Sequence, residues 1–275
     1  MVKAMKRAVM LAALALLAAG AGRAQQQTGP MNAPANPPLI HRIPLYPQVP
    51  PPPMSPDQII AHFISNETLY EAEYEKYGFL EAIRVEELGP KGGVTGDLQV
   101  ETEVFDKPGG GQYQRVLNSS PSTLQYLKFS YQDLETAASM PLFPLAGSAA
   151  ADYNFTYRGT QKEGELTTYA FQVKPKSMQQ GRIYFSGVIW VDNVDLAIVK
   201  SYGHFVSTDP TPANVLPFTF YDTYRENVAG KYWFPSYVRS DDFFEKGKQQ
   251  IPIRLIVTSS HFHPGQPQIP PAKTP

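Results

Sequence analysis

Hydrophobic and polar residues alternate along most of the chain after residue 78, and the pattern is strongest between residues 181 and 204. Two runs, 182–191 and 196–205, flank the polar connection Asp192-Asn193-Val194-Asp195. Asn and Asp tolerate left-handed backbone angles and bond their own main chain, so this connection predicts a tight reversal between two strands. The first run is apolar on both faces, one formed by Ile183, Phe185, Ile189 and Val191 and the other by Tyr184, Val188 and Trp190. Such a strand is typical of the middle of a sheet.

The same period of two predicts eight further strands, at residues 79–88, 94–105, 112–118, 154–158, 166–174, 218–226, 232–240 and 251–259. Several of the connections between them are short and rich in Gly or Pro. About ten strands joined by short hairpins predict an antiparallel meander with helices on one of its faces.

A long helix is predicted to begin near residue 55. Ser55 can cap it, Pro56 suits its first position, and Gln58 can complete a capping box. Apolar residues then recur at spacings of three and four over about five turns, at Ile59, Ile60, Phe63, Ile64, Tyr70, Tyr74 and Tyr77. Glu67, Glu71, Glu73 and Glu75 make the polar face acidic, which argues against a helix on a membrane surface. We therefore expect the helix to pack onto the sheet.

A second, short helix is predicted from Tyr131, where the strand pattern lapses, and Pro141 and Pro144 end it. The apolar segment from Met140 to Leu145 that follows has two interpretations. It could form a flexible lid, or a loop pinned to the core.

The N-terminus has the features of a secretory signal. Lys3, Lys6 and Arg7 precede an apolar run over residues 8–19, and Gly22-Arg23-Ala24 resembles a cleavage site. The run is too short to span a bilayer, and no later stretch is long and apolar enough, so we expect a cleaved, periplasmic or secreted protein without a transmembrane segment. The expected division is a signal peptide at 1–24, a proline-rich disordered leader at 25–54, one domain at 55–263, and a proline-rich disordered tail at 264–275.

Composition and charge exclude several classes of function. Without residues 1–24 the chain has 20 basic against 25 acidic residues, a balance with no general attraction for nucleic acid or anionic lipid. The chain has no Cys, so a thiol nucleophile and disulfides are excluded, and it has no Gly-x-Ser-x-Gly motif. His261 and His263 lie on one face of a strand but have no third ligand nearby. Carboxylate pairs such as Asp192/Asp195 are explained by turn chemistry. We therefore predict a protein that is not an enzyme and binds neither metal nor cofactor.

Aromatic residues are unusually frequent on the predicted strands, at Tyr184, Phe185, Trp190, Phe205, Phe218, Phe220, Tyr221, Tyr224, Tyr232, Trp233, Phe234 and Tyr237. They could fill an ordinary core between sheet and helix. They could also line a groove for a lipid chain or an apolar peptide, because binding sites are concave and mostly apolar. One helix of about 20 residues and one short helix cannot cover a sheet of ten strands, which leaves room for such a groove.

The run RIYFSGVIWVD at residues 182–192, followed by Asp195-Leu196 and Ile198-Val199-Lys200, resembles the signature hairpin of bacterial periplasmic proteins of the outer-membrane lipoprotein-sorting, LolA-like type. Residues 224–227 (YREN) and 230–235 (GKYWFP) resemble the next hairpin of one uncharacterised branch of that family. The resemblance covers residues 56–262. It implies a half-barrel, a strongly curved antiparallel sheet whose concave face is plugged by helices. Relatives hold lipoprotein acyl chains or other lipids in that cavity, or sense misassembled envelope components.

These observations lead to one hypothesis and one alternative. The hypothesis is non-enzymatic binding of a lipid or lipoprotein acyl chain in an apolar concave cavity, in transport towards the outer membrane. The residues predicted to line the cavity are Phe185, Trp190, Phe220, Trp233, Ile253 and Leu255. Alternation groups the residues of one strand but does not say which face is concave. The alternative is an interaction or stress-sensing module of the cell envelope, with other envelope proteins as partners and a cavity filled by its own helix.

Overall fold

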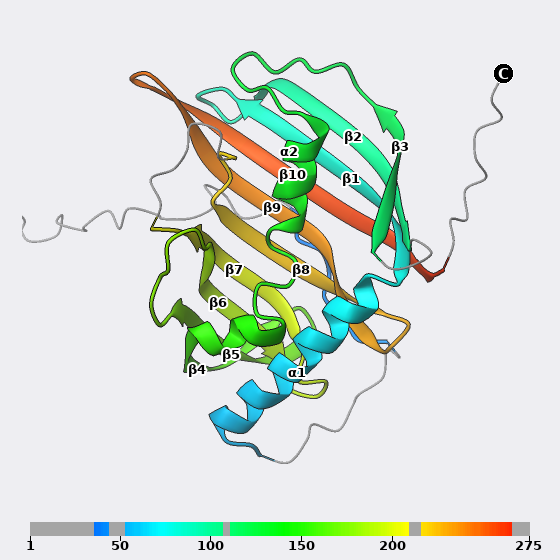
Figure 1. The fold of residues 1–275 in the computed structure, drawn as a ribbon, viewed down its shortest axis with the longest axis vertical. Helices are drawn as coiled ribbons and strands as arrows, with labels where there is room; N and C mark the ends of the chain where they lie inside the picture. The colour runs from blue at the N-terminus through cyan, green and yellow to red at the C-terminus, as the bar shows by residue number, and fades with distance from the viewer. Residues whose placement is uncertain (1–35, 44–52, 107–110, 209–215, 266–275) are drawn as a thin grey trace, which may run out of the picture.

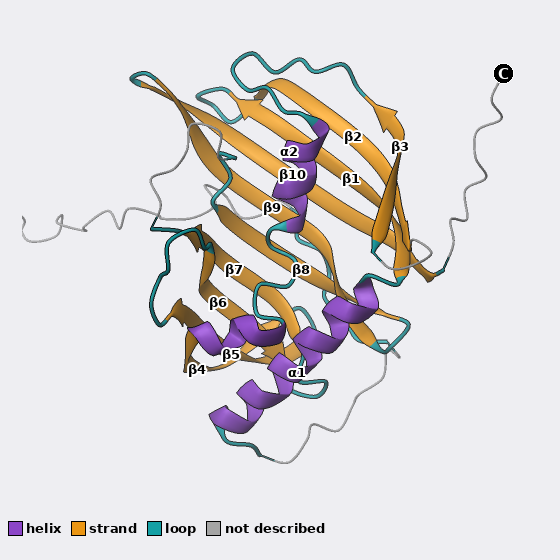
Figure 2. Ribbon diagram, viewed as in Figure 1, coloured by secondary structure: helices purple, strands orange, loops and turns teal. Residues whose placement is uncertain are grey.

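The computed structural model describes residues 36–43, 53–106, 111–208 and 216–265. The predicted signal peptide, most of the leader and nearly all of the predicted tail lie outside these ranges. The described residues form ten strands in one antiparallel sheet, two α-helices and one 3₁₀ helix (Figures 1 and 2). The sheet is open, because its edge strands β3 and β4 do not pair with each other. The predicted fold class, a mainly β protein with a half-barrel sheet, one long helix and one short helix, is confirmed.

In chain order the elements are α1 (Pro56–Tyr74), β1 (Tyr77–Leu88), β2 (Val94–Asp106), β3 (Gln112–Ser119), α2 (Tyr131–Ser139), η1 (Gly147–Asp152), β4 (Tyr153–Glu163), β5 (Leu166–Pro175), β6 (Tyr184–Asp192), β7 (Ile198–Val206), β8 (Phe220–Val228), β9 (Tyr232–Lys246) and β10 (Gln249–Pro264). None of the helices in these ranges has the length and apolar character needed to cross a membrane.

The strand order is β3-β2-β1-β10-β9-β8-β7-β6-β5-β4, so the sheet combines two meanders. Strands β1–β3 form one and β4–β10 the other, and they join where β1 pairs with β10. The connection from β3 to β4 therefore runs from one edge of the sheet to the other, and it contains α2 and η1. The chain thus places its short helices across the face that α1 also covers (Figure 1). We call this the inner face and the opposite one the outer face.

The helix α1 begins as the sequence predicts. The Ser55 hydroxyl accepts from the Gln58 amide at 3.3 Å, and the Gln58 side chain accepts from the Ser55 amide at 2.9 Å. Its buried residues are Ile59, Phe63, Glu67, Tyr70 and Tyr74. The helix ends at Tyr74, earlier than predicted, because Tyr77 already begins β1.

Buried apolar residues of the inner face fall into two regions. Beneath α2, the buried residues come mainly from β1, β2, β9 and β10 and include Ile83, Val85, Val100, Val238, Ile251, Ile253, Leu255 and Val257. We call this set, with the residues packed on it, the α2 region. Beneath α1, two further clusters contain Phe63, Tyr70, Tyr74, Phe171, Phe185, Ile189 and Phe234. We call these the α1 region.

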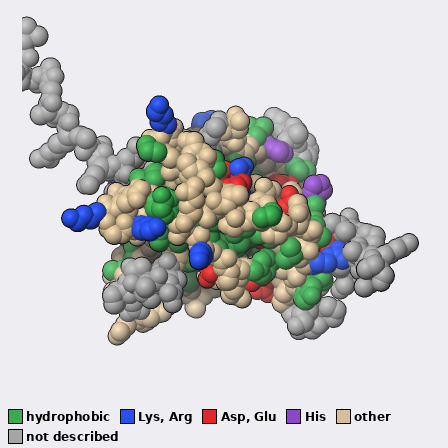
Figure 3. Space-filling model, turned by 90° about the horizontal axis from the view of Figure 1, so that it is seen from above, with side chains coloured by type: hydrophobic (Ala, Val, Ile, Leu, Met, Phe, Trp, Pro, Cys, Tyr) green, Lys and Arg blue, Asp and Glu red, His purple; other side chains and the backbone are tan. Residues whose placement is uncertain are grey.

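Charged side chains are mixed in sign on the surface of the described residues that Figure 3 shows, with hydrophobic side chains between them. No extended patch of one sign covers this face. The distribution agrees with the nearly balanced charge of the sequence.

Candidate functional site

The helix α2 covers its part of the inner face thinly. It has nine residues, and a capping box of Ser130 and Asp133 begins it. Only Leu134, Ala137 and Ala138 are buried, so two of the three buried side chains of the helix are single methyl groups. Partly exposed hydrophobic residues surround the contact, at Leu98, Leu124, Tyr126, Phe129, Tyr131, Met140, Leu142, Phe205 and Phe244. The apolar surface beneath α2 therefore reaches solvent at its margins.

Three hydroxyl groups lie buried on β8 and β9 at this surface. The side-chain oxygens of Tyr221, Thr223 and Ser240 have no hydrogen-bond partner among the described residues, although these residues are at most 1% exposed. A buried polar atom without a partner costs about 1–3 kcal/mol. Burial and the nearby Asp242 carboxylate raise the pKa of Tyr221 well above its ordinary value, so its hydroxyl keeps its proton. All three groups are therefore hydrogen-bond donors with no acceptor in the described chain.

A buried carboxyl group lies at the same interface. Glu81 on β1 is 7% exposed, and burial, reinforced by Glu135 of α2, raises its pKa from 4.5 to about 7. Its Oε2 atom has no hydrogen-bond partner in the described ranges. Tyr131, also on α2, has its pKa raised to about 12 by burial and by these two glutamates. When Glu81 is ionised, its carboxylate and that of Glu135 therefore repel each other where α2 packs on the sheet.

The α1 region differs, because its buried charges are paired. The Arg225 guanidinium on β8 forms an ion pair with Glu67 of α1, and both side chains are at most 3% exposed. The Arg225 Nη2 also donates to the Leu142 carbonyl at 3.0 Å, and the guanidinium lies 4.9 Å from the Phe143 ring centroid. Leu145, which follows, is fully buried. The segment from Met140 to Leu145 is therefore pinned to the core, as in the second of its two interpretations.

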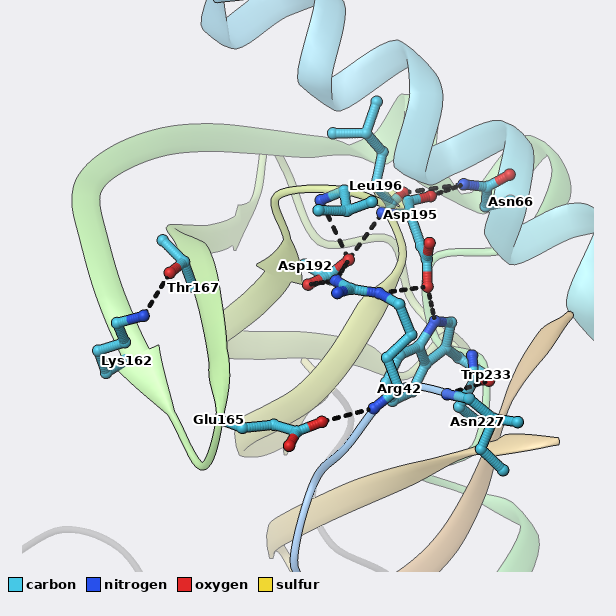
Figure 4. A network of polar contacts seen from close by, with 12 residues as sticks. Arg42, Asn66, Lys162, Glu165, Thr167, Asp192, Asp195, Leu196, Asn227 and Trp233 are labelled. Atoms are coloured by element: carbon cyan, nitrogen blue, oxygen red, sulfur yellow. Dashed lines mark hydrogen bonds and ion pairs between the residues drawn. The ribbon is translucent and has the colours of Figure 1, made fainter. Parts of the chain in front are cut away.

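Residues 36–43 of the proline-rich leader pack against the hairpin turns of the α1 region (Figure 4). Ile40 is 3% exposed, the Arg42 guanidinium donates to both carboxylate oxygens of Asp192 at 2.6 Å, and the Arg42 amide donates to Glu165. The Ile43 amide donates to Asn227 at 3.1 Å. The prediction of a disordered leader is therefore wrong for these residues, because three turns supply hydrogen-bond partners that composition does not reveal.

Asp192 and Asp195 have the turn role predicted for them. The Asp192 carboxylate accepts from the Val194 and Asp195 amides at 3.0 and 2.7 Å. Asp195 accepts from the Trp233 indole at 2.9 Å, and its carbonyl accepts from Asn66 of α1 (Figure 4). Burial raises the pKa of Asp192, although the turn amides and Arg42 oppose this shift. The turn therefore connects the leader, α1 and β9.

The six residues predicted to line a cavity do not share one surface. Phe185, Ile253 and Leu255 lie on the inner face and are fully buried, the first in the α1 region and the other two in the α2 region. Trp233 is also buried and is bonded to Asp195. Trp190 and Phe220, in contrast, lie on the outer face.

The positions of Trp190 and Phe220 follow from alternation. Trp190 is five residues from Phe185 on β6, so it must point to the opposite side, where its indole donates to Gln161 at 2.7 Å. Phe220 pairs with His204 on β7, and the two rings lie 5.0 Å apart. His204 and Phe220 line a shallow hollow of about 340 Å³ over the Gly187–Gly203 pair on the outer face. The prediction grouped apolar residues without regard to strand parity, and this placed Phe185 and Trp190 together.

Thr223, Ser240, Glu81 and Glu135 are candidate site residues that the sequence analysis did not identify. Tyr221 was recognised only as one of many aromatic residues on strands. Alternation could have placed Tyr221 and Thr223 on one face of β8, because they are two residues apart. No sequence signal shows that their hydroxyls lack partners. Among the described residues, no group of three His, Asp or Glu side chains is arranged to hold a metal ion.

No protein-family model and no curated protein matches the sequence. Solved structures match the fold. A DUF1329 family protein from Desulfovibrio piger shares 12% identity at a TM-score of 0.37, over 76% of this chain and 92% of the other. A putative outer membrane lipoprotein-sorting protein domain from Vibrio parahaemolyticus shares 12% identity at a TM-score of 0.34, over 77% of this chain and 95% of the other. A LolA superfamily protein from Nitrosomonas europaea shares 10% identity at a TM-score of 0.32, over 79% of this chain and 96% of the other.

Two of these structures have the lipoprotein-sorting and LolA superfamily names that the resemblance of residues 182–200 implied. Identities of 10–12% concern the fold alone, so no residue role is transferred from these proteins.

Proposed function

We propose that this protein binds the acyl chain of a lipid or lipoprotein in the periplasm, between α2 and the inner face of β1, β9 and β10, and catalyses no reaction. The observation that carries the proposal is the thin contact of α2, which buries Leu134 and two alanines over a wide apolar surface. A chain that entered at the partly exposed margin would lie along residues such as Ile253 and Leu255. Carriage of the bound lipid towards the outer membrane would be the physiological purpose.

Apolar burial supplies enough free energy for such binding. Each buried CH₂ group contributes about 0.8 kcal/mol, so ten methylenes supply roughly 8 kcal/mol before the costs of ordering the chain and moving α2. Because this attraction is not ionic, binding should persist at 1 M salt. A loss of binding at that salt concentration would favour a polar partner instead.

The first test is native mass spectrometry of the protein purified from a bacterial periplasm, followed by lipid analysis of the extract. A lipid bound in nearly stoichiometric amount supports the proposal. A mass without ligand, together with no uptake of added fatty acid or lipopeptide, contradicts it.

A variant pair locates the binding site. Ala137→Phe places a ring between α2 and the sheet, whereas Thr136→Phe places the same ring on the exposed side of the same helix. We expect acyl-chain affinity to fall about tenfold in the first variant and to remain unchanged in the second, measured by displacement of a fluorescent fatty acid. Equal affinities would place the ligand elsewhere. Circular dichroism of both variants checks that the fold is retained.

The alternative function, an envelope interaction module whose interior is filled by its own helices, is favoured by one observation. In the α1 region the interior is occupied by Phe63, Tyr70 and Tyr74 of α1 and by the Arg225–Glu67 pair. If the α2 region were equally closed in solution, no lipid would enter, and partners would bind the outside.

A further inference from the structure

We propose that the hydroxyl groups of Tyr221, Thr223 and Ser240 form a polar subsite on the inner face that recognises the ester carbonyl of an acyl ligand. This inference rests on the proposed function and makes its ligand specific. The ligand would be an O-acylated glycerol rather than a plain hydrocarbon chain. Both free glycerolipids and the diacylglyceryl group of lipoproteins have this chemistry.

The strand register places the three hydroxyls close together. Tyr221 and Thr223 are two residues apart on β8 and so project from the same face, opposite Gly203 and Ser201 of β7. Ser240 lies on β9, next to Arg239, which pairs with Asp222. Adjacent strands are separated by about 5 Å, so the three groups form one patch across β8 and β9.

The surroundings of the patch are apolar. The Phe205 ring packs edge-on to Tyr221, at 5.6 Å between centroids. Val238 pairs with Thr223, and Leu255 pairs with Ser240. A hydrocarbon chain along the α2 region would therefore end, or be interrupted, at a group of three donors.

Two other hydroxyls of the sheet show the usual arrangement, whereas the Thr102 hydroxyl on β2 also lacks a partner among the described residues. The Tyr224 hydroxyl, on the outer face of β8, donates to Asp222, and Thr168 on β5 donates to the Gln161 carbonyl. Buried polar groups in proteins nearly always have a partner. Phe, Val and Ala would fill the same volumes as Tyr221, Thr223 and Ser240 without a polar atom. Three adjacent exceptions to this rule are expected where a ligand, and not the chain, completes the hydrogen bonds.

An ester carbonyl fits the donors better than other lipid groups do. Its oxygen has two lone pairs and accepts from hydroxyls, whereas an alkyl chain offers no acceptor. A charged headgroup would be opposed by the apolar surroundings, because burying an unpaired charge is far more unfavourable than burying a neutral dipole. The phosphate or peptide part of the ligand would therefore remain outside the α2 region.

The test compares 1-monolauroyl-glycerol with 1-O-dodecyl-glycerol, which differ in the carbonyl group. We expect the wild-type protein to bind the ester about tenfold more tightly than the ether. The triple variant Tyr221→Phe, Thr223→Val, Ser240→Ala should bind both with the affinity of the ether, and the three single variants should each lose part of the preference. Thr258→Val, on the outer face of β10, is the control and should keep it.

Thermal unfolding of the ligand-free variants provides a second measurement. Because the substitutions remove unpaired buried atoms, the Tm should stay equal or rise, while ester recognition is lost. A marked fall in Tm would mean that the hydroxyls have a structural role, such as binding internal water, and would overturn the inference.

The outcomes separate this inference from the proposed function. Equal binding of ester and ether by the wild-type protein overturns the subsite but leaves acyl binding intact. Binding of neither compound overturns acyl binding and the subsite with it. A dipalmitoylated lipopeptide and a diacylglycerol, tested in parallel, show whether a lipoprotein or a free glycerolipid is the preferred source of the ester.

Discussion

The two helices cover the inner face in different ways. α1, with 19 residues, packs Phe63, Tyr70 and Tyr74 against the sheet, and its Glu67 pairs with Arg225 of β8. α2, with nine residues, inserts Leu134 and two alanines. The α1 region is therefore filled by large side chains, and the α2 region is covered by a helix with little volume to place there.

The two regions also differ in whether their buried polar groups have partners. In the α1 region the buried charges Glu67, Arg225 and Asp192 all have partners of opposite charge. In the α2 region the Tyr221, Thr223 and Ser240 hydroxyls and one oxygen of Glu81 have none among the described residues. Selection for stability alone would remove such groups, so the difference is consistent with a structural role for the α1 region and with the ligand binding proposed for the α2 region.

Breaking the Arg225–Glu67 pair should have the largest effect on stability. Arg225→Ala leaves the Glu67 carboxylate buried without a partner, and we expect a loss of about 3–5 kcal/mol in the free energy of unfolding, measured in urea. The double variant Glu67→Gln, Arg225→Met should recover much of that loss, because no buried charge remains. If Arg225→Ala and the double variant were equally destabilised, packing and not charge pairing would support α1.

The Glu81 carboxyl should make the α2 region weaker at alkaline pH. Its folded pKa of about 7 exceeds the ordinary 4.5, so the folded protein holds this proton more tightly than the unfolded chain does. This group's contribution to stability is therefore present below pH 4.5 and is lost as the pH rises through 7. The difference in pKa corresponds to roughly 3 kcal/mol.

Glu81→Gln tests this pH dependence. The variant should be more stable than the wild type at pH 8 and equal to it near pH 4.5, in urea unfolding at each pH. Glu101→Gln, on the outer face of the neighbouring strand, controls for the loss of one negative charge. A constant difference between wild type and Glu81→Gln across this pH range would show that Glu81 does not titrate there.

Local sequence signals predicted most of the elements. The capping residues Ser55 and Gln58 located the start of α1, and alternation located the strands with errors of up to six residues at their ends. The pairing of β1 with β10 was not predicted, because hairpin signals specify only strands that are neighbours in the chain. Long-range pairing depends on the packing of the whole sheet.

The candidate site was harder to predict for the same reason. Trp190 was grouped with Phe185 although the two residues have opposite parity on one strand, and Phe220 was misplaced because parity within one strand does not relate one strand to the next. Thr223 and Ser240 have no unusual local sequence, and their importance depends on the absence of tertiary partners. Composition also misrepresented the leader, where prolines surround a short segment that docks.

Gly164 and Gly230 lie where residues 36–43 dock, and both positions require glycine. Both have positive φ angles, of 57° and 70°, in the β4–β5 and β8–β9 turns. A Cβ atom would approach the Ile40 carbonyl oxygen to 2.9 Å at Gly164 and the Ile43 carbonyl oxygen to 2.6 Å at Gly230. Only glycine therefore permits both the turn geometry and the close passage of the leader.

Removal of the Arg42 side chain should have the smallest effect on stability of the three changes. Arg42→Ala leaves the buried Asp192 carboxylate without its cationic partner, and we expect a loss of about 1–3 kcal/mol. Asp192 keeps its bonds from the turn amides, so the loss should be smaller than for Arg225→Ala. Hydrogen exchange should accelerate in the turns next to the leader, and limited proteolysis should cut residues 36–43 faster. Acyl affinity should not change, because residues 36–43 contact turns of the α1 region; a change in affinity would show that the two regions are coupled.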